Sequence, residues 1–118
     1  MARKYDWKNG CNVEATLSVI GGRWKPVILC NLGEPIRFGA LCRAMPNATQ
    51  RMITLQLREL EADGVIKRTV YAEVPPRVEY ELTEFGRSLE PVLEVMSDWG
   101  VEFKKRKRAE APEADDAA

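Results

Sequence analysis

The chain has 118 residues, of which 45% are hydrophobic and 31% are charged, a composition typical of one soluble globular domain. Its 18 basic and 18 acidic residues cancel, which argues against a protein that coats nucleic acid through bulk charge but leaves room for a local basic surface. It contains no histidine and neither of the common glycine-rich phosphate-binding motifs, so an enzyme is not expected and no cofactor is predicted.

Metal sites and membrane segments are not expected either. The three cysteines, Cys11, Cys30 and Cys42, lack the C-x-x-C spacing typical of structural zinc sites, so no metal is predicted. No apolar run approaches the roughly 20 residues that cross a bilayer, and the first ten residues lack the apolar centre of a secretory signal. We therefore expect a cytoplasmic protein with no membrane partner.

The N-terminal part of the chain predicts an arm and two helices. Residues 1–10 form a polar arm that either lies loose or packs across a partner subunit. Residues 11–22 predict a short helix with one apolar stripe, ended by two glycines. Residues from about 24 to 32 predict a second helix, apolar nearly all round and therefore expected to be buried, with Cys30 in the core.

The next elements predict a helix-turn-helix. Residues 36–37 favour a very short strand, and residues 38–45 favour a third helix. A turn at residues 46–48 separates it from a helix predicted for residues 49–64. Two helices joined by such a short turn are typical of a DNA-binding helix-turn-helix.

The stretch 49–64 is the centre of the functional prediction. Thr49 is a good N-cap and Gly64 suits the left-handed position that closes a helix. One side of the helix is an apolar stripe facing the core, made by Ile53, Leu57 and Leu60. The other side is predicted to bind DNA in the major groove, through Gln50 at the helix mouth and Arg51, Thr54, Leu55 and Arg58. The alternative is an ordinary solvated face.

A β-hairpin follows. Val65–Tyr71 and Val78–Leu82 are rich in β-forming residues and flank a loop with two prolines, which predicts the wing of a winged helix. Lys67, Arg68 and Arg77 are candidate phosphate contacts, and Arg77 at the loop is placed to reach the minor groove. The alternative is that these cations only solubilise an edge hairpin.

The C-terminal part predicts a long helix after a cap at Thr83, with Pro91 kinking or restarting it. Its apolar spacing continues for more turns than one small domain needs. We therefore expect a homodimer interface, with packing inside one chain as the alternative; its expected residues are Leu89, Val92, Leu93, Met96, Trp99 and Phe103. A two-fold dimer suits a palindromic DNA operator. Residues 104–118 are expected to be a charged, disordered tail.

Three blocks of sequence resemble one known family. GGRW, LRELEADG and VPPRVEYELTEFG together are similar to the HxlR-type, MarR-like branch of winged helix-turn-helix bacterial regulators, over residues 11–103. The resemblance implies a mainly α fold with a small β-hairpin: a winged helix-turn-helix domain with N- and C-terminal dimerisation helices. It also implies a reading helix at 49–63, a wing tip at 74–77 and binding of operator DNA. Relatives often carry Gln where this chain has Leu55, which suits contact with a thymine methyl group.

Cys11 is a candidate redox switch. It stands at the start of the first helix, where backbone N–H groups and the helix dipole stabilise a thiolate. Some relatives sense oxidants or electrophiles at this position, so the resemblance implies a thiol-reactive or small-molecule effector. Asn12, where relatives often have Pro, offers an alternative cap that would push Cys11 outside the helix. The other alternative is that Cys11 serves as a small apolar residue at the dimer interface. Cys42, on the third predicted helix, is a candidate partner thiol for it.

The sequence therefore predicts a dimeric, sequence-specific DNA-binding transcriptional regulator. A winged helix that binds only proteins is the alternative, favoured by the zero net charge. A thiol redox enzyme is a third hypothesis, which would need a resolving cysteine and a substrate pocket.

Overall fold

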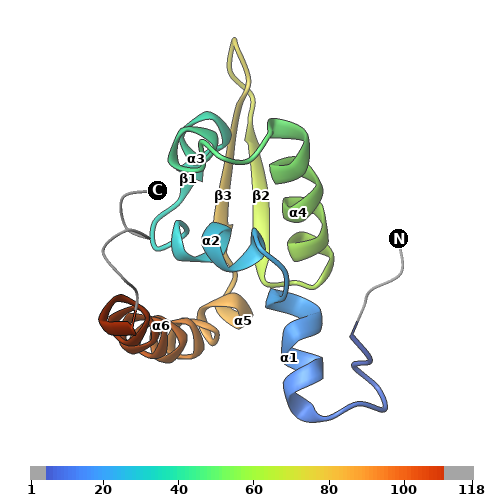
Figure 1. Ribbon diagram of the computed structural model, residues 1–118. Coiled ribbons are helices and arrows are strands. Elements are labelled where there is room, and N and C mark those ends of the chain that lie inside the picture. The colour runs from blue at the N-terminus through green and yellow to red at the C-terminus, as the bar shows by residue number, and fades with distance from the viewer. Residues whose placement is uncertain (1–4, 111–118) are drawn as a thin grey trace. The chain divides into compact units, whose positions relative to one another are not determined.

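The structure, a computed structural model, describes residues 5–110. Two compact units divide the chain, one ending at Arg87 and the other beginning at Ser88. The first unit holds α1 (Asn12–Ile20), α2 (Lys25–Cys30), β1 (Ile36–Arg37), α3 (Phe38–Ala44), α4 (Gln50–Ala62), β2 (Ile66–Tyr71), β3 (Arg77–Leu82) and α5 (Glu84–Arg87) (Figure 1). The second unit holds α6 (Glu90–Glu110).

A small antiparallel sheet organises the first unit. Its strand order is β1-β3-β2, with α4 alongside β2 and α3 alongside β1 and β3 (Figure 1). Arg68 pairs with Tyr80, and directly opposed residues share a face of the sheet. The face of Ile66, Tyr80 and Leu82 is buried against the helices. The loop between β2 and β3 projects beyond the helices as the wing (Figure 1).

The core follows the predicted periodicity. Ile53, Leu57 and Leu60 are at most 1% exposed, which confirms the inward stripe of α4. They pack with further fully buried residues, among them Ile20, Ile28, Leu32, Leu41 and Val65. Burial of one such side chain contributes roughly 1.5–3 kcal/mol. This core fixes the orientation of α4 and therefore decides which of its side chains reach solvent.

The second helix was expected to be buried, and this prediction holds for only part of its surface: Ile28 and Leu29 are buried, and two other residues are exposed. The helix spans only Lys25–Cys30, with Pro26 in its first turn, and it exposes Val27 and Cys30. Its packing partners are α1 and α4, so the side away from them faces solvent. Apolar composition predicted burial on every side, but the helix has neighbours on only some of them.

The described part of the N-terminal arm folds back along α1. The Asp6 carboxylate accepts hydrogen bonds from the amides of Lys8 and Asn9, and the Asp6 amide donates to Glu14 on α1. Tyr5 reaches the far end of the same helix, where its ring lies so close to Gly21 that a Cβ there would come within 2.6 Å. The arm is therefore attached to its own chain in this structure, and residues 1–4 lie outside the described part.

Tight packing joins α5 to the start of β2. A Cβ on Gly86 would lie 1.9 Å from the carbonyl oxygen of Val65, so this position accepts only glycine. Beside it, the Thr83 hydroxyl donates to the Gly64 carbonyl oxygen at 2.6 Å and accepts from the Gly86 amide at 3.0 Å. Thr83 therefore caps the four-residue helix α5 and not the long helix that was predicted to follow it, and its hydroxyl also holds the end of α4.

The helix of the second unit is long and has no buried residue. A turn at residues 88–89 separates α5 from α6, and Pro91 is the second residue of α6, which confirms that the helix restarts there. The prediction of a disordered tail was wrong for residues 104–110, which continue α6. Lys, Arg and Ala are good helix formers, and cations are favourable at a helix C-terminus. Residues 111–118 lie outside the described part. Within residues 5–110, no helix combines the length and hydropathy needed to cross a membrane.

Candidate nucleic-acid interface

Both ends of α4 are fixed as the sequence predicted. The Met52 amide donates a hydrogen bond to the Thr49 hydroxyl at 3.1 Å, which confirms Thr49 as the N-cap. The helix ends at Ala62 with Asp63 as its C-cap, and Gly64 follows with a φ of +79°, a conformation that favours glycine. The amide groups at the start of α4 and the side chains of its first turns are therefore held in a defined orientation.

The predicted reading side chains of α4 reach solvent. Arg51, Leu55 and Arg58 are exposed, Gln50 is exposed at the helix start, and Thr54 is half-buried. Leu55 leaves 40% of its surface accessible, and its spacing of four from Arg51 and three from Arg58 puts the three residues on one side of the helix. An exposed face of this kind has hydrogen-bond donors and an apolar group of the types that suit base edges in a major groove.

The wing cations differ in how they are partnered. Lys67 forms an ion pair with Glu81 at 3.0 Å, across the face of the sheet away from the helices. Arg68, the next residue, points to the opposite face and lies near α4. Among the described residues no carboxylate pairs with it.

Arg77 is more constrained than the sequence suggested. It is the first residue of β3 and not part of the loop, and its guanidinium lies 2.9 Å from both Glu73 and Glu79. The same guanidinium stacks over the Tyr71 ring at 3.9 Å. The exposed tip of the wing is instead Val74, with Pro75 and Pro76 beside it. Arg77 therefore lies at the start of β3 rather than in the loop, and its contact with the minor groove stays a prediction.

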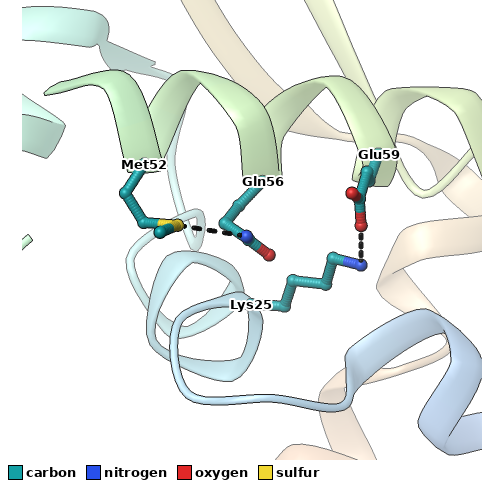
Figure 2. A network of polar contacts seen from close by, with 4 residues as sticks. All are labelled: Lys25, Met52, Gln56 and Glu59. Carbon is teal, nitrogen blue, oxygen red and sulfur yellow. Dashed lines mark hydrogen bonds and ion pairs between the residues drawn. The ribbon is translucent and has the colours of Figure 1, made fainter. Parts of the chain in front are cut away.

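An ion pair that the sequence reasoning missed connects α2 to α4 (Figure 2). Lys25 Nζ lies 2.5 Å from Glu59 Oε1, and the Lys25 side chain is only 8% exposed. On the same side of α4, Gln56 donates a hydrogen bond to the Met52 sulfur at 3.4 Å (Figure 2). The sequence did contain one sign of this ion pair, a lysine at the start of an otherwise apolar helix. A lysine in such a place is seldom buried without a partner.

The three cysteines are all free, and their surroundings differ. Cys11 is exposed and is itself the N-cap of α1, so Asn12 does not displace it from the helix start. Cys30 was expected in the core and is exposed. Burial raises the pKa of the Cys42 thiol more than the nearby Arg43 lowers it, which disfavours Cys42 as a reactive thiolate.

One side of α6 gathers exposed apolar side chains. At about 100° per residue, Val92, Met96, Trp99 and Phe103 share one side of the helix, and all four are exposed. Trp99 is 69% exposed and stacks on Phe103 at a ring distance of 5.6 Å. Leu89 and Leu93 are half-buried. Adjoining apolar side chains of this size mark an interaction surface rather than scattered exposure.

Comparison with known proteins identifies the family. A model of the HxlR-like helix-turn-helix family matches residues 19–108. The chain is 58% identical over 98 residues to the uncharacterized HTH-type transcriptional regulator YdeP of Bacillus subtilis (strain 168), covering 82% of this chain and 77% of YdeP. It is 59% identical over 100 residues to the uncharacterized regulator YtcD of the same organism, covering 84% and 79%.

Solved structures agree in fold. The redox regulator HypR in its reduced form matches with a TM-score of 0.80 and 50% identity, covering 84% of this chain and 99% of that chain. The oxidized form of HypR matches with a TM-score of 0.75 and 55% identity, covering 78% and 96%. The fold is a winged helix-turn-helix, and the chain belongs to the HxlR-like helix-turn-helix family.

Proposed function

We propose that this chain is a dimeric, sequence-specific DNA-binding transcriptional regulator that reads its operator with α4. The observation that carries the proposal is the division of α4: three apolar side chains are buried, and two arginines with no ion-pair partner among the described residues stand on the exposed side. Guanidinium groups bind guanine edges and phosphates, and Leu55 suits a thymine methyl group. Because the regulator acts on DNA, we place it in the cytoplasm.

The homodimer in this proposal is formed through α6. Within residues 88–110 nothing covers its apolar side, and the rest of the helix surface carries Glu90, Glu94, Asp98 and Glu102. Such one-sided polarity suits a helix that packs on a second copy of itself. Two copies related by a two-fold axis would present two α4 helices to a palindromic operator.

The effector is proposed to act through Cys11. Its thiol is exposed and stands at the N-terminus of α1, where it is accessible to an oxidant or electrophile. The relative HypR is described as a redox regulator with oxidized and reduced forms. Cys11→Ser is expected to keep DNA binding and to lose the response of that binding to diamide. A variant that responds to diamide like the wild type would exclude Cys11 as the switch.

Fluorescence anisotropy tests the DNA-binding proposal. The purified protein is titrated onto the DNA upstream of its own gene and onto a scrambled duplex, over a series of salt concentrations. Tight binding to upstream DNA alone, weakening steeply with salt, supports an operator-binding protein that regulates its own gene. If binding is equal and weak on both, selection of genomic fragments follows. Failure to select any sequence would instead favour a winged helix that binds proteins.

A further inference from the structure

A hollow lies between α4 and the helix-facing side of the wing strands. It encloses about 320 Å³ and is lined by Thr54, Arg58, Glu61, Arg68 and Tyr80. The three α4 residues follow one another at intervals of four and three, so they share one side of the helix. Arg68 and Tyr80 are directly opposed on β2 and β3 and face that side. The hollow therefore belongs jointly to the reading helix and to the wing.

The charges in this hollow are not neutralised by the chain. Among residues 5–110, neither Arg58 nor Arg68 forms an ion pair, whereas the neighbouring wing cations Lys67 and Arg77 are both paired with glutamates. Glu61 is the one acidic side chain in the lining, so the two guanidinium groups leave a net positive charge. Guanidinium groups that face a shared hollow without a carboxylate partner favour an anionic ligand.

Hydroxyl groups complete a set of donors. Thr54 is half-buried, and within the described part of the chain its hydroxyl has no hydrogen-bond partner. Tyr80 is 7% exposed, and its hydroxyl likewise bonds to none of the described residues. Two arginines and two hydroxyls are the groups that bind phosphate oxygens in protein–DNA complexes.

We propose that this hollow binds a backbone phosphodiester of double-stranded DNA. The inference rests on the proposed function and adds the position of the strand. When α4 enters a major groove and the wing reaches toward the adjacent minor groove, the sugar-phosphate strand between the two grooves passes between α4 and β2. Arg68 is then the phosphate-binding cation of the wing, and Lys67 and Arg77 stabilise the hairpin itself.

A comparison of two adjacent residues tests this assignment. Lys67 and Arg68 carry the same charge on opposite faces of β2, so Lys67→Ala is a matched control for Arg68→Ala. We expect Arg68→Ala and Arg58→Ala each to reduce the slope of log K against log salt by about 0.9, the value for one lost phosphate contact. Each should also weaken binding by about tenfold or more at low salt. Lys67→Ala should keep the wild-type slope.

Controls separate a lost contact from a lost fold. Thermal unfolding, monitored by circular dichroism, shows whether each variant is folded. If Arg68→Ala is unstable, Arg68→Lys, which keeps the charge at this position, is used in its place. Equal slopes for Arg68→Ala and wild type, or equal losses for Lys67→Ala and Arg68→Ala, would overturn the proposal. Because a backbone contact does not depend on sequence, the slopes are also measured on scrambled DNA. If the wild type binds operator and scrambled DNA equally well, the proposed sequence-specific function fails. The change in salt slope caused by Arg68→Ala still tests the phosphate site on either DNA.

Uncharged phosphates distinguish DNA from a small anion as the ligand. Duplexes carrying a single methylphosphonate at successive positions should weaken wild-type binding at one position per half-site, and Arg68→Ala should be insensitive there. Inorganic phosphate, added at constant ionic strength, should compete only weakly. A flat methylphosphonate scan together with Arg68-dependent binding of inorganic phosphate would overturn the DNA assignment and indicate a small-anion site.

Discussion

The helices α4 and α6 both have one exposed side, but the two sides differ in chemistry. In α4 the apolar residues are buried and the exposed side carries Arg51 and Arg58. In α6 no residue is buried and the exposed apolar side carries Trp99 and Phe103. The first arrangement suits a charged, hydrogen-bonding ligand, and the second suits an apolar protein surface. Exposure alone therefore does not identify a DNA-binding helix; the chemistry of the exposed side does.

The largest effect is expected on α6. Trp99→Glu combined with Phe103→Glu places two charges on the apolar side and should convert the proposed dimer to a monomer, at a cost of at least about 2 kcal/mol in association. Sedimentation equilibrium measures the oligomeric state. Val101→Glu, on the opposite side of the same helix, should leave the dimer intact. If the double variant remains a dimer, or if Val101→Glu also dissociates it, the two sides of α6 do not have the assigned roles.

The inner side of α4 is tested through its ion pair. Lys25→Met removes the partner of Glu59 and should lower the free energy of unfolding by about 1–3 kcal/mol, the range for a partly buried group that loses its partner. Urea denaturation measures the change. Adding Glu59→Gln should recover part of the loss because a neutral amide does not depend on the cation that Lys25 supplies. Strictly additive effects of the two substitutions would show that the pair contributes nothing as a pair.

The outer side of α4 is tested through Arg51. Arg51→Ala should cost about 1–3 kcal/mol of specific DNA binding, the range for one arginine contact with a base edge. Anisotropy on upstream DNA measures the loss, and urea denaturation should show an unchanged fold because the side chain is exposed. Comparison with scrambled DNA shows whether the loss is one of specificity. Unchanged affinity would remove Arg51 from the reading face.

The smallest expected effect lies at the start of α4. Thr49→Ala removes the hydroxyl that accepts the Met52 amide and should destabilise the fold by about 1 kcal/mol. Thermal or urea unfolding measures this, and Thr49→Ser, which keeps the acceptor, is the matched control. A Thr49→Ser variant as unstable as Thr49→Ala would mean that the cap does not act through its hydroxyl.

Features decided by local chemistry were predicted well from the sequence. The boundaries of α4, its inward stripe, the wing strands and the restart at Pro91 follow from caps, periodicity and proline geometry, each of which acts over a few residues. Recognition of the family agreed with these predictions because its blocks coincide with those elements. The structure places the predicted reading residues Arg51, Leu55 and Arg58 at the surface.

Features decided by distant contacts were not predicted. The pairing of Lys25 with Glu59 joins positions 34 residues apart, so the local pattern shows that Lys25 needs a partner but does not identify Glu59 as that partner. The exposure of Cys30 depends on which sides of α2 have neighbours. The ion pairs of Arg77 differ, because Glu73 and Glu79 are near neighbours in sequence and the conformation of the wing decides the pairing. The two-residue period of a strand predicts that Lys67 and Arg68 point to opposite faces of the sheet. Which of the two faces borders the hollow depends on where α4 packs.

The close approach at Gly86 limits how this sequence can vary. Because a Cβ there would overlap the backbone of Val65, no rotamer choice can relieve the clash, and relief would require the chain itself to move. In a saturation library selected for folded protein, position 86 should retain a single residue type, while exposed positions of α6 away from the apolar side tolerate many. Evolution or engineering can therefore change the exposed positions of α6 away from its apolar side, but it cannot change Gly86, near the end of the winged domain.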